Sequence, residues 1–310
     1  MPVAWLIVAR SVQIAASILL AGIFAFEVVT LGPALRARSD DLNELERQFF
    51  QLALWGLVAV LLSALIWFSL EVKSVSGLAF AKVFSGRAWR TLLFETEFGL
   101  VWRVRLGLTV VTFVLAELTL LKEQLRRPFL PVLLLLSVVL LVSLAWISHA
   151  AATRAQPLGL LGDALHLCAA GVWIGGLAPL AIFLTRAHRS FTLANCAAPV
   201  LKRFSMLSLG CVSVLAVSGV SNIWSLVGSI HALFTTRYGW LLLFKITLFG
   251  ILVGFGARNR FVIKTKTLNS PASSDLLVRL RRNVICETCL GLAVVIIVAC
   301  LGIMPPARHP

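Results

Sequence analysis

Eight apolar runs, each about as long as a bilayer is thick, divide this chain of 310 residues. A helix needs about 20 apolar residues to cross a hydrocarbon core of ~30 Å. Within lipid the backbone must satisfy its own hydrogen bonds, which a helix does. We therefore predict an all-α, polytopic integral membrane helical bundle. Its eight transmembrane helices are predicted at 4–31, 49–70, 98–121, 129–150, 158–184, 201–227, 238–261 and 284–304.

The composition excludes a soluble globular domain of this size. Hydrophobic residues make up 59% of the chain, charged residues only 13%, and the mean hydropathy is +0.96. No internal repeat and no second soluble domain is visible, so residues 1–310 are predicted to form a single membrane domain. The first run lacks a preceding basic segment and a small-residue cleavage site, which predicts a retained helix rather than a removed signal peptide.

The net charge of +15 is best explained by membrane topology. Seventeen Lys and Arg residues lie in the loops after the first, third, fifth and seventh runs, and seven lie on the other side. Basic loops stay in the cytoplasm, so both termini are predicted outside. No nucleic-acid partner is needed to explain the charge.

The longest outer connection includes an amphipathic segment at approximately residues 75–97. It mixes apolar and basic side chains, which predicts that it lies at the outer membrane interface.

Asp163 and His166 form a titratable pair within the fifth apolar run. Ionisable groups are costly in hydrocarbon unless they are paired or line a cavity, so this pair is a candidate site. Imidazole binds copper and zinc, and a neutral nitrogen in a poorly hydrated place suits copper. Asp163 lies one helical turn before His166, where it can fix the imidazole tautomer or bind metal itself. The alternative is a buried His–Asp hydrogen bond that locks two helices together.

A second histidine, His149, ends the fourth run, and only AATRAQP separates it from the fifth. So short a connection makes the two helices antiparallel neighbours, which would bring His149 and His166 together in the outer leaflet. His149, His166 and Asp163 are therefore the predicted metal ligands. His231, in a short outer loop, and Met304, near the C-terminus, are weaker candidates on the same side.

The six cysteines indicate no disulfide framework, because five fall within predicted spans and one in a cytoplasmic loop. Cys286 and Cys289 form one close pair, CETC, at the inner end of the eighth run. Thiols at i and i+3 face one way and can hold Cu(I), which prefers soft ligands. The alternative is that both are small packing residues, as free cysteines often are.

Other polar and small residues in the spans have structural interpretations. Gly171, Gly175 and Gly176 form a small-residue face that allows another helix to approach closely. Arg10 and Arg105 lie near predicted outer ends, where long side chains can reach the interface. The chain has no nucleophile motif, phosphate loop, HExxH or GxGxxG, so we expect no enzymatic activity.

Several motifs resemble the CopD copper-resistance family of bacterial inner-membrane proteins, which includes the PcoD type. They are ISHAAA at 147–152, DALHLCAAGVWIGGLAPL at 163–180, RFSMLSLGCVSVLAVSGVSNIW at 203–224, RYGWLLLFKITLFGILVGFGARNR at 237–260, and the stretches RRNVICE and MPPA near the end. The resemblance implies a multi-pass inner-membrane protein of eight helices in copper homeostasis. It implies import of copper ions from the periplasm, often beside a periplasmic CopC-type copper-binding protein. The family's metal residues correspond here to His149, Asp163 and His166.

Two other functions remain open at this stage. Histidines on facing helices, such as His149 and His166, can ligate a b-type haem, which would make the protein a membrane cytochrome. A non-transporting membrane anchor for a periplasmic copper protein is the third possibility. A Soret absorption band would indicate the membrane cytochrome. A lack of copper flux in vesicles would indicate the membrane anchor.

Overall fold

The computed structural model describes residues 2–32, 39–77, 86–147, 157–266 and 274–305, and helices dominate these segments. Eight of the helices described are long and apolar enough to cross a membrane, which confirms the predicted all-α bundle. The elements are α1 (Pro2–Ala25), η1 (Phe26–Leu31), α2 (Asp40–Ser76), α4 (Arg87–Phe94), α5 (Glu97–Leu121), α6 (Glu123–Val142), η3 (Ser143–Ile147), α7 (Pro157–Ala187), α8 (Phe191–Val227), α9 (Ile230–Thr235), α10 (Arg237–Lys266) and α11 (Ser274–Leu301).

The long helices begin and end at residues suited to those positions. Ser39, Thr96 and Ser190 each accept a hydrogen bond from a backbone N–H of the first turn that follows, at the starts of α2, α5 and α8. Gly77 and Gly228 end α2 and α8 with φ of 65° and 72°, a left-handed conformation that favours glycine. These caps lie outside the apolar runs, so α2 and α8 extend beyond the predicted 49–70 and 201–227.

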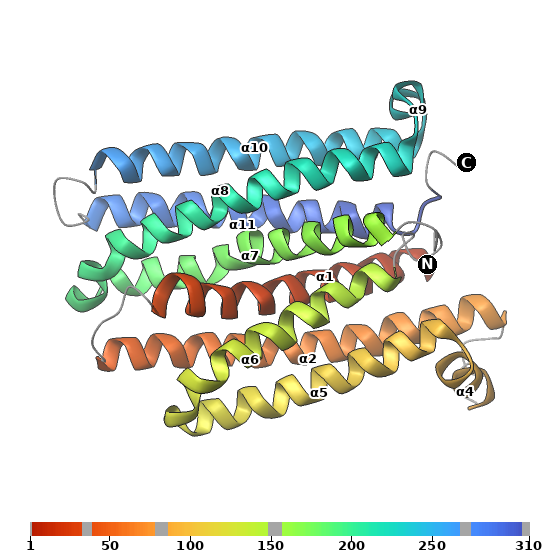
Figure 1. Cartoon of the computed structure of the whole chain (residues 1–310), viewed down its shortest axis with the longest axis horizontal. Coiled ribbons are helices and arrows are strands. Elements are labelled where there is room, and N and C mark those ends of the chain that lie inside the picture. Colours follow the sequence, from red (N-terminus) through yellow and green to blue (C-terminus); the bar gives the residue numbers. More distant parts are fainter. Residues whose placement is uncertain (1, 33–38, 78–85, 148–156, 267–273, 306–310) are drawn as a thin grey trace.

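Two helices, α1 and α7, lie in the middle of the bundle (Figure 1). On one side of them are α2, α5 and α6, and on the other are α8, α10 and α11. The two central helices touch backbone to backbone. A Cβ on Gly175 would lie 2.0 Å from the carbonyl oxygen of Ile18, and one on Gly22 would lie 2.0 Å from the carbonyl carbon of Gly175. The prediction of a close-packing glycine face on α7 is confirmed.

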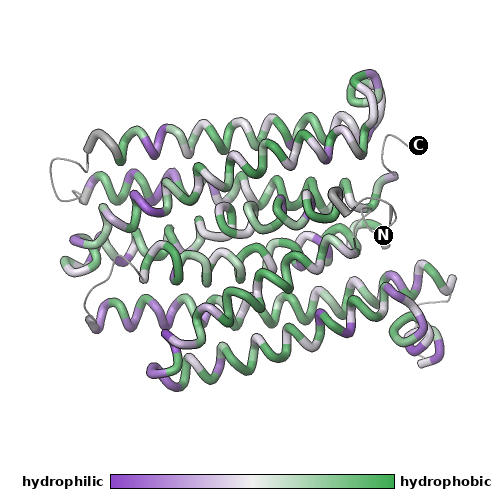
Figure 2. Tube along the Cα trace, in the orientation of Figure 1, coloured by the Kyte–Doolittle hydropathy of each residue, from purple (hydrophilic) through white to green (hydrophobic). Residues whose placement is uncertain are grey.

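All eight spans run along the long axis of the molecule, so the bundle has two distinct ends (Figure 1). Pro2, α4 and α9 lie at one end, which we call the Pro2 end. The starts of α2, α6, α8 and α11 lie at the opposite end. Hydrophilic residues gather near both ends, and the middle of the bundle is mainly hydrophobic (Figure 2).

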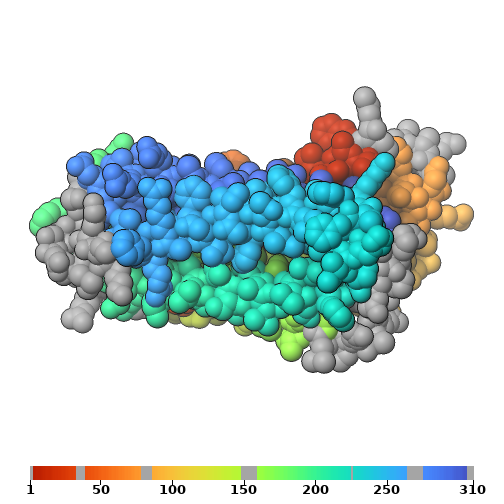
Figure 3. Space-filling model, turned by 90° about the horizontal axis from the view of Figure 1, so that it is seen from above, coloured from red at the N-terminus to blue at the C-terminus, as the bar shows by residue number. Residues whose placement is uncertain are grey.

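The sides of the bundle are apolar as well as its core. Figure 3 shows α8 and α10 side by side along one face of the elongated molecule. Large apolar side chains on these helices are exposed, among them Val217 at 75% and Trp240 at 62%. Such continuous apolar exposure is typical of a surface covered by lipid. The protein is therefore a multi-pass membrane protein.

The short helix α4 confirms part of the predicted amphipathic segment. Ala88, Trp89, Leu92 and Leu93 pack against a cluster of buried apolar residues, and Arg90 is exposed. Residues 78–85 of that segment lie outside the described residues.

The prediction that Arg105 reaches the membrane interface is wrong. Its side chain is buried, with 2% of the residue exposed. Its Nη1 donates to the carbonyl oxygen of Leu140 at 2.7 Å and to the hydroxyl of Ser143, both near the end of α6. The rotation of α5 turns Arg105 toward α6 rather than toward lipid. Arg10 also stays in the bundle, with its guanidinium carbon 4.5 Å from the ring centre of Trp67.

Candidate copper site

The structure places Asp163 and His166 on the part of α7 nearest the Pro2 end, one helical turn apart and both partly buried. The imidazole Nδ1 of His166 lies 2.8 Å from Oγ of Ser218 on α8. The Ser218 hydroxyl donates to the carbonyl oxygen of Val214 at 2.6 Å, so its oxygen is left to accept a proton from Nδ1. His166 then carries its proton on Nδ1, and the lone pair of Nε2, which no described residue contacts by a hydrogen bond, can bind a metal ion.

Asp163 forms a second link between α7 and α8. Its Oδ1 accepts a hydrogen bond of 2.7 Å from Nδ2 of Asn222, which lies one turn beyond Ser218 on α8. No described residue donates to its other oxygen, Oδ2. The prediction that Asp163 fixes the tautomer of His166 is therefore wrong in this structure, because Ser218 has that role. Both groups hydrogen bond to α8, His166 to Ser218 and Asp163 to Asn222.

The helix α10 brings charge to the same place. Lys245 interacts electrostatically with both Asp163 and His166, and Tyr238 interacts with Asp163. Within the described part of the chain, Lys245 makes no direct ion pair with Asp163. The site thus joins a carboxylate and an imidazole of α7, each hydrogen bonded to a residue of α8, with an ammonium of α10.

The other predicted ligands lie apart from this pair. His231 is exposed on α9, and Met304 packs beside a separate apolar cluster that includes Val227 and Leu301. His149 lies outside the described residues, so its predicted approach to His166 stays a prediction. Across the described ranges, no group of three or more His, Cys, Asp and Glu side chains gathers as a metal site.

The cysteine pair of α11 faces away from the bundle interior. Cys286 and Cys289 are both exposed, whereas Glu287 between them is buried with 2% of the residue exposed. Neighbouring positions on a helix point in different directions, about 100° apart at 3.6 residues per turn. The two thiols therefore lie on the side of α11 that faces lipid.

Sequence reasoning missed Ser218 and Asn222, although a signal for them exists. They are polar, they lie four residues apart, and they occur within the apolar run of α8. Residues at i and i+4 share one face of a helix, so a polar pair in a span predicts contact with another polar group. It also missed Glu287 and Asn259, which hydrogen bond to each other across α10 and α11.

The chemistry of the site suits copper as cargo. A neutral imidazole nitrogen and a carboxylate oxygen are both ligands of copper, and the nitrogen is the preferred one. The hydrogen bonds with α8 orient both groups, and no described residue hydrogen bonds to Nε2 or Oδ2, an arrangement common around metal ligands.

Known proteins match this chain along most of its length. The family described as "Copper resistance protein D-like, N-terminal domain" matches residues 1–160, and that described as "Copper resistance protein D" matches residues 198–301. No solved structure matches the chain.

Three curated relatives carry names consistent with these matches. "Copper transport protein CutJ" of Bacillus subtilis is 29% identical over 285 residues, which cover 89% of this chain and 49% of the relative. The chain therefore spans about half the length of that relative. "Inner membrane protein YebZ" of Escherichia coli is 29% identical over 71% of this chain and 72% of its own. "Copper resistance protein D" of Pseudomonas syringae pv. tomato is 32% identical over 66% of this chain and 68% of its own. On these matches and on its eight apolar helices, the chain belongs to the copper resistance protein D family of membrane proteins.

Proposed function

We propose that this protein imports copper ions across the bacterial inner membrane, and that His166 and Asp163 form the entry site. The observation that carries the proposal is an imidazole nitrogen and a carboxylate oxygen, both without a hydrogen-bond partner among the described residues, on a membrane-spanning helix of a copper resistance family member. Each group is held by its own hydrogen bond with a residue of α8, so neither needs to reorganise to accept an ion.

The distribution of basic residues supports the direction. Connections at the opposite end of the bundle hold most of the Lys and Arg residues of the loops, which favours a cytoplasmic location for that end. The Pro2 end is then periplasmic, and the His166 site lies nearer the compartment from which copper arrives. A periplasmic CopC-type carrier is the partner that this direction would require at the Pro2 end.

The charges at the site shape how it binds an ion. Asp163 attracts a copper ion, and Lys245 repels it. Because the charges of Asp163 and Lys245 cancel, the site is close to neutral when it is empty. Such balance lowers the cost of leaving the site unoccupied in hydrocarbon. It also limits affinity, which lets the ion leave in the next step. His149, predicted beside His166, is our candidate for a third ligand.

The test is copper accumulation in cells that express full-length variants at equal levels. His166→Ala is expected to lose most of the accumulation, because it removes the nitrogen ligand. Asp163→Asn is expected to lose less, because the amide keeps the shape and the contact with Asn222. His188→Ala, in the turn just after the far end of α7, is the control and should accumulate copper like the wild type. Wild-type accumulation in both site variants would refute the proposal.

Two measurements on the purified protein, an absorption spectrum and copper flux in vesicles, distinguish the other candidate functions. A haem ligated by His166 would give a Soret band in the absorption spectrum, and we expect none. A membrane anchor without transport would show no copper flux in vesicles, whereas we expect a flux that falls strongly in His166→Ala.

A further inference from the structure

Glu27 is a buried carboxyl group in the first span, just beyond the end of α1 that lies away from Pro2 (Figure 1). Only 3% of the residue is exposed, and no described residue forms a hydrogen bond to either of its carboxyl oxygens. The hydroxyl of Thr30, three residues further on, is also buried without a partner among the described residues. An ionisable group that is buried in a membrane span without a partner is costly, so it marks a functional site.

The backbone around Glu27 departs from the regular α-helix. The element η1 is a π-helix, in which the N–H of Gly32 donates to the carbonyl oxygen of Glu27, five residues earlier. Such turns are rare and occur frequently at functional sites. The ring of Phe26 packs against aromatic rings of α2, α7 and α8. Apolar contacts therefore hold the turn in place, and no polar partner is needed to position Glu27.

Two charged side chains act on Glu27 from neighbouring helices. The negative charge of Glu46 on α2 opposes a second carboxylate, whereas the positive charge of Arg126 on α6 favours one. In the described structure no ion pair joins Arg126 to Glu27. Instead, Nη1 of Arg126 lies 3.7 Å from Oε2 of Glu46 and 3.7 Å from Oε1 of Glu123. Three carboxyl groups thus share one guanidinium, an arrangement that favours a proton on one of them.

This network extends from the buried carboxyl group to the surface. Arg126 is anchored, because its Nε donates to the carbonyl oxygen of Thr119 at 3.2 Å and its Nη2 to that of Leu120 at 3.4 Å. Of the side chains that share its Nη1, Glu46 is 24% exposed and Glu123 is 53% exposed. The exposed carboxylates lie at the end of the bundle that the basic loops predict to be cytoplasmic.

The other helices that pack against η1 carry charged side chains of their own. On α7, Arg186 pairs with Glu44 at 3.2 Å, and on α8 the nearest in sequence to the aromatic contact are Lys202 and Arg203. Within the described ranges, neither helix adds to the two electrostatic partners of the buried carboxyl group.

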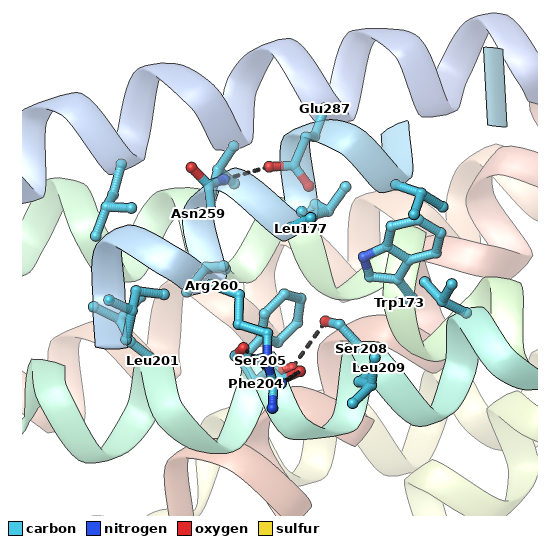
Figure 4. Close-up of a pocket in the computed structure, with 18 residues that line it drawn as sticks. Trp173, Leu177, Leu201, Phe204, Ser205, Ser208, Leu209, Asn259, Arg260 and Glu287 are labelled. Carbon is cyan, nitrogen blue, oxygen red and sulfur yellow. Dashed lines mark hydrogen bonds between the residues drawn. The ribbon is translucent and has the colours of Figure 1, made fainter. Parts of the chain in front are cut away.

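A second buried carboxyl group, Glu287 of α11, differs in having a partner. It lines a mostly apolar cavity of about 150 Å³ between α7, α8, α10 and α11 (Figure 4). Its Oε1 accepts a hydrogen bond of 2.5 Å from Nδ2 of Asn259, whose Oδ1 accepts one of 2.7 Å from Nδ2 of Asn283. This chain of amides gives Glu287 a structural role between α10 and α11, which Glu27 lacks among the described residues.

We propose that Glu27 is a proton-binding site open to the cytoplasmic end, and that its proton occupancy sets the rate of copper transport. Only the second part rests on the proposed function. A proton needs a single oxygen, so the site requires no cluster of ligands. When the proton from cytoplasmic water is bound, Glu27 is neutral and Arg126 pairs with Glu46. When it returns to that water, a second carboxylate joins Glu46 beside the same guanidinium.

The position of Glu27 links this site to the entry site. The first span, which ends in η1, lies backbone to backbone against α7 at Gly22 and Gly175, and α7 carries His166. A rearrangement of η1 on proton binding therefore bears on the helix that holds the copper ligand.

Infrared spectroscopy of the purified full-length protein, titrated over pH without copper, tests the proton site. A protonated carboxyl group gives a C=O stretching band that a carboxylate lacks. The wild type is expected to show one more protonated carboxyl group at neutral pH than Glu27→Gln. Glu117→Gln, the same change at a partly exposed position of α5, is the matched control and should keep the wild-type band. A wild-type band in Glu27→Gln would overturn the proposal.

Glu46→Gln tests the network and leaves Glu27 in place, so it also serves if Glu27→Gln does not fold. It removes the negative charge near Glu27 and leaves Arg126 to act on Glu27 more strongly. Both effects favour the ionised form, so the band should disappear at a pH about 1 unit or more below that of the wild type. An unchanged titration in Glu46→Gln would count against the site.

Copper flux in vesicles tests the link to transport, with the pH varied on the cytoplasmic side only. The wild-type flux is expected to change with this pH, and the flux of Glu27→Gln is expected to stay constant. The same pH dependence in both would overturn the link. No flux in the wild type at any pH would refute the proposed function instead, and the infrared titration would still decide whether Glu27 binds a proton.

Discussion

Trp173 of α7 and Phe249 of α10 meet edge to face, with their ring centres 6.2 Å apart and their planes at 84°. Trp173 is buried, with 2% of the residue exposed, and it also lines the cavity that holds Glu287. We expect this aromatic pair to act as an apolar barrier between that cavity and the polar residues around His166.

Removing the Trp173 ring should open this barrier. We expect Trp173→Ala to speed passive copper release from loaded vesicles several-fold, because no other side chain fills the space of the indole. Trp173→Phe keeps an aromatic ring against Phe249 and should release copper like the wild type. The measurement is the release rate without a gradient of any other ion. Equal rates in Trp173→Ala and the wild type, with both folded, would place the barrier elsewhere.

Ser218 should matter for copper affinity although it need not bind the ion. Its oxygen holds the Nδ1 proton of His166, so Ser218→Ala frees the ring and the tautomer. Loss of such an orienting contact typically weakens metal binding by about 10- to 100-fold. Ser213→Ala, which removes an exposed hydroxyl from the same helix, is the control. Copper titration of the purified variants gives both affinities, and equal values would show that Ser218 does not orient His166.

The contact between α1 and α7 should not tolerate a side chain. A Cβ at position 175 would lie 2.0 Å from a backbone oxygen of α1, which cannot move aside as a flexible side chain can. Gly175→Ala is therefore expected to cost about 1–3 kcal/mol or more in stability, as overpacking does. Gly250→Ala meets no atom within 4 Å and should leave the midpoint of thermal unfolding unchanged or slightly higher. A Gly175→Ala variant as stable as the wild type would contradict the close backbone contact.

Reporter fusions check the orientation. Alkaline phosphatase at the C-terminus should be active, and a fluorescent protein inserted within 262–283 should fold and emit light. The reason is that the loops at the end of the bundle that includes residues 262–283 hold an excess of Lys and Arg, and such loops stay in the cytoplasm. An inactive phosphatase fusion at normal expression would reverse the direction and put the His166 site on the cytoplasmic side.

Replacing both Cys286 and Cys289 by Ser should leave copper accumulation unchanged. Both side chains face outward from α11, so neither lies on a route through the bundle. Abolished accumulation at normal protein level would instead assign the thiols a role in transport.

Sequence patterns alone were sufficient for the architecture of this protein. Whether a segment crosses a bilayer depends on its own length and hydropathy, which are local properties, so all eight spans could be predicted. The glycines of α7 also indicated a close helix contact correctly, because small residues permit it whatever the partner. The partner itself, Ile18 and Gly22 of α1, was not predictable from spacing.

The candidate site depended on contacts between helices distant in sequence. His166 and Asp163 could be singled out because titratable groups are rare in apolar runs, yet their partners lie 52 and 59 residues away. Which residue faces inward is set by the rotation of each helix about its axis. That rotation turned Glu287 into the cavity and Cys286 out toward lipid, and it buried Arg105. Hydropathy determines that a helix spans the membrane. The packing of its neighbours determines which of its polar groups can meet, and only the tertiary structure decided that.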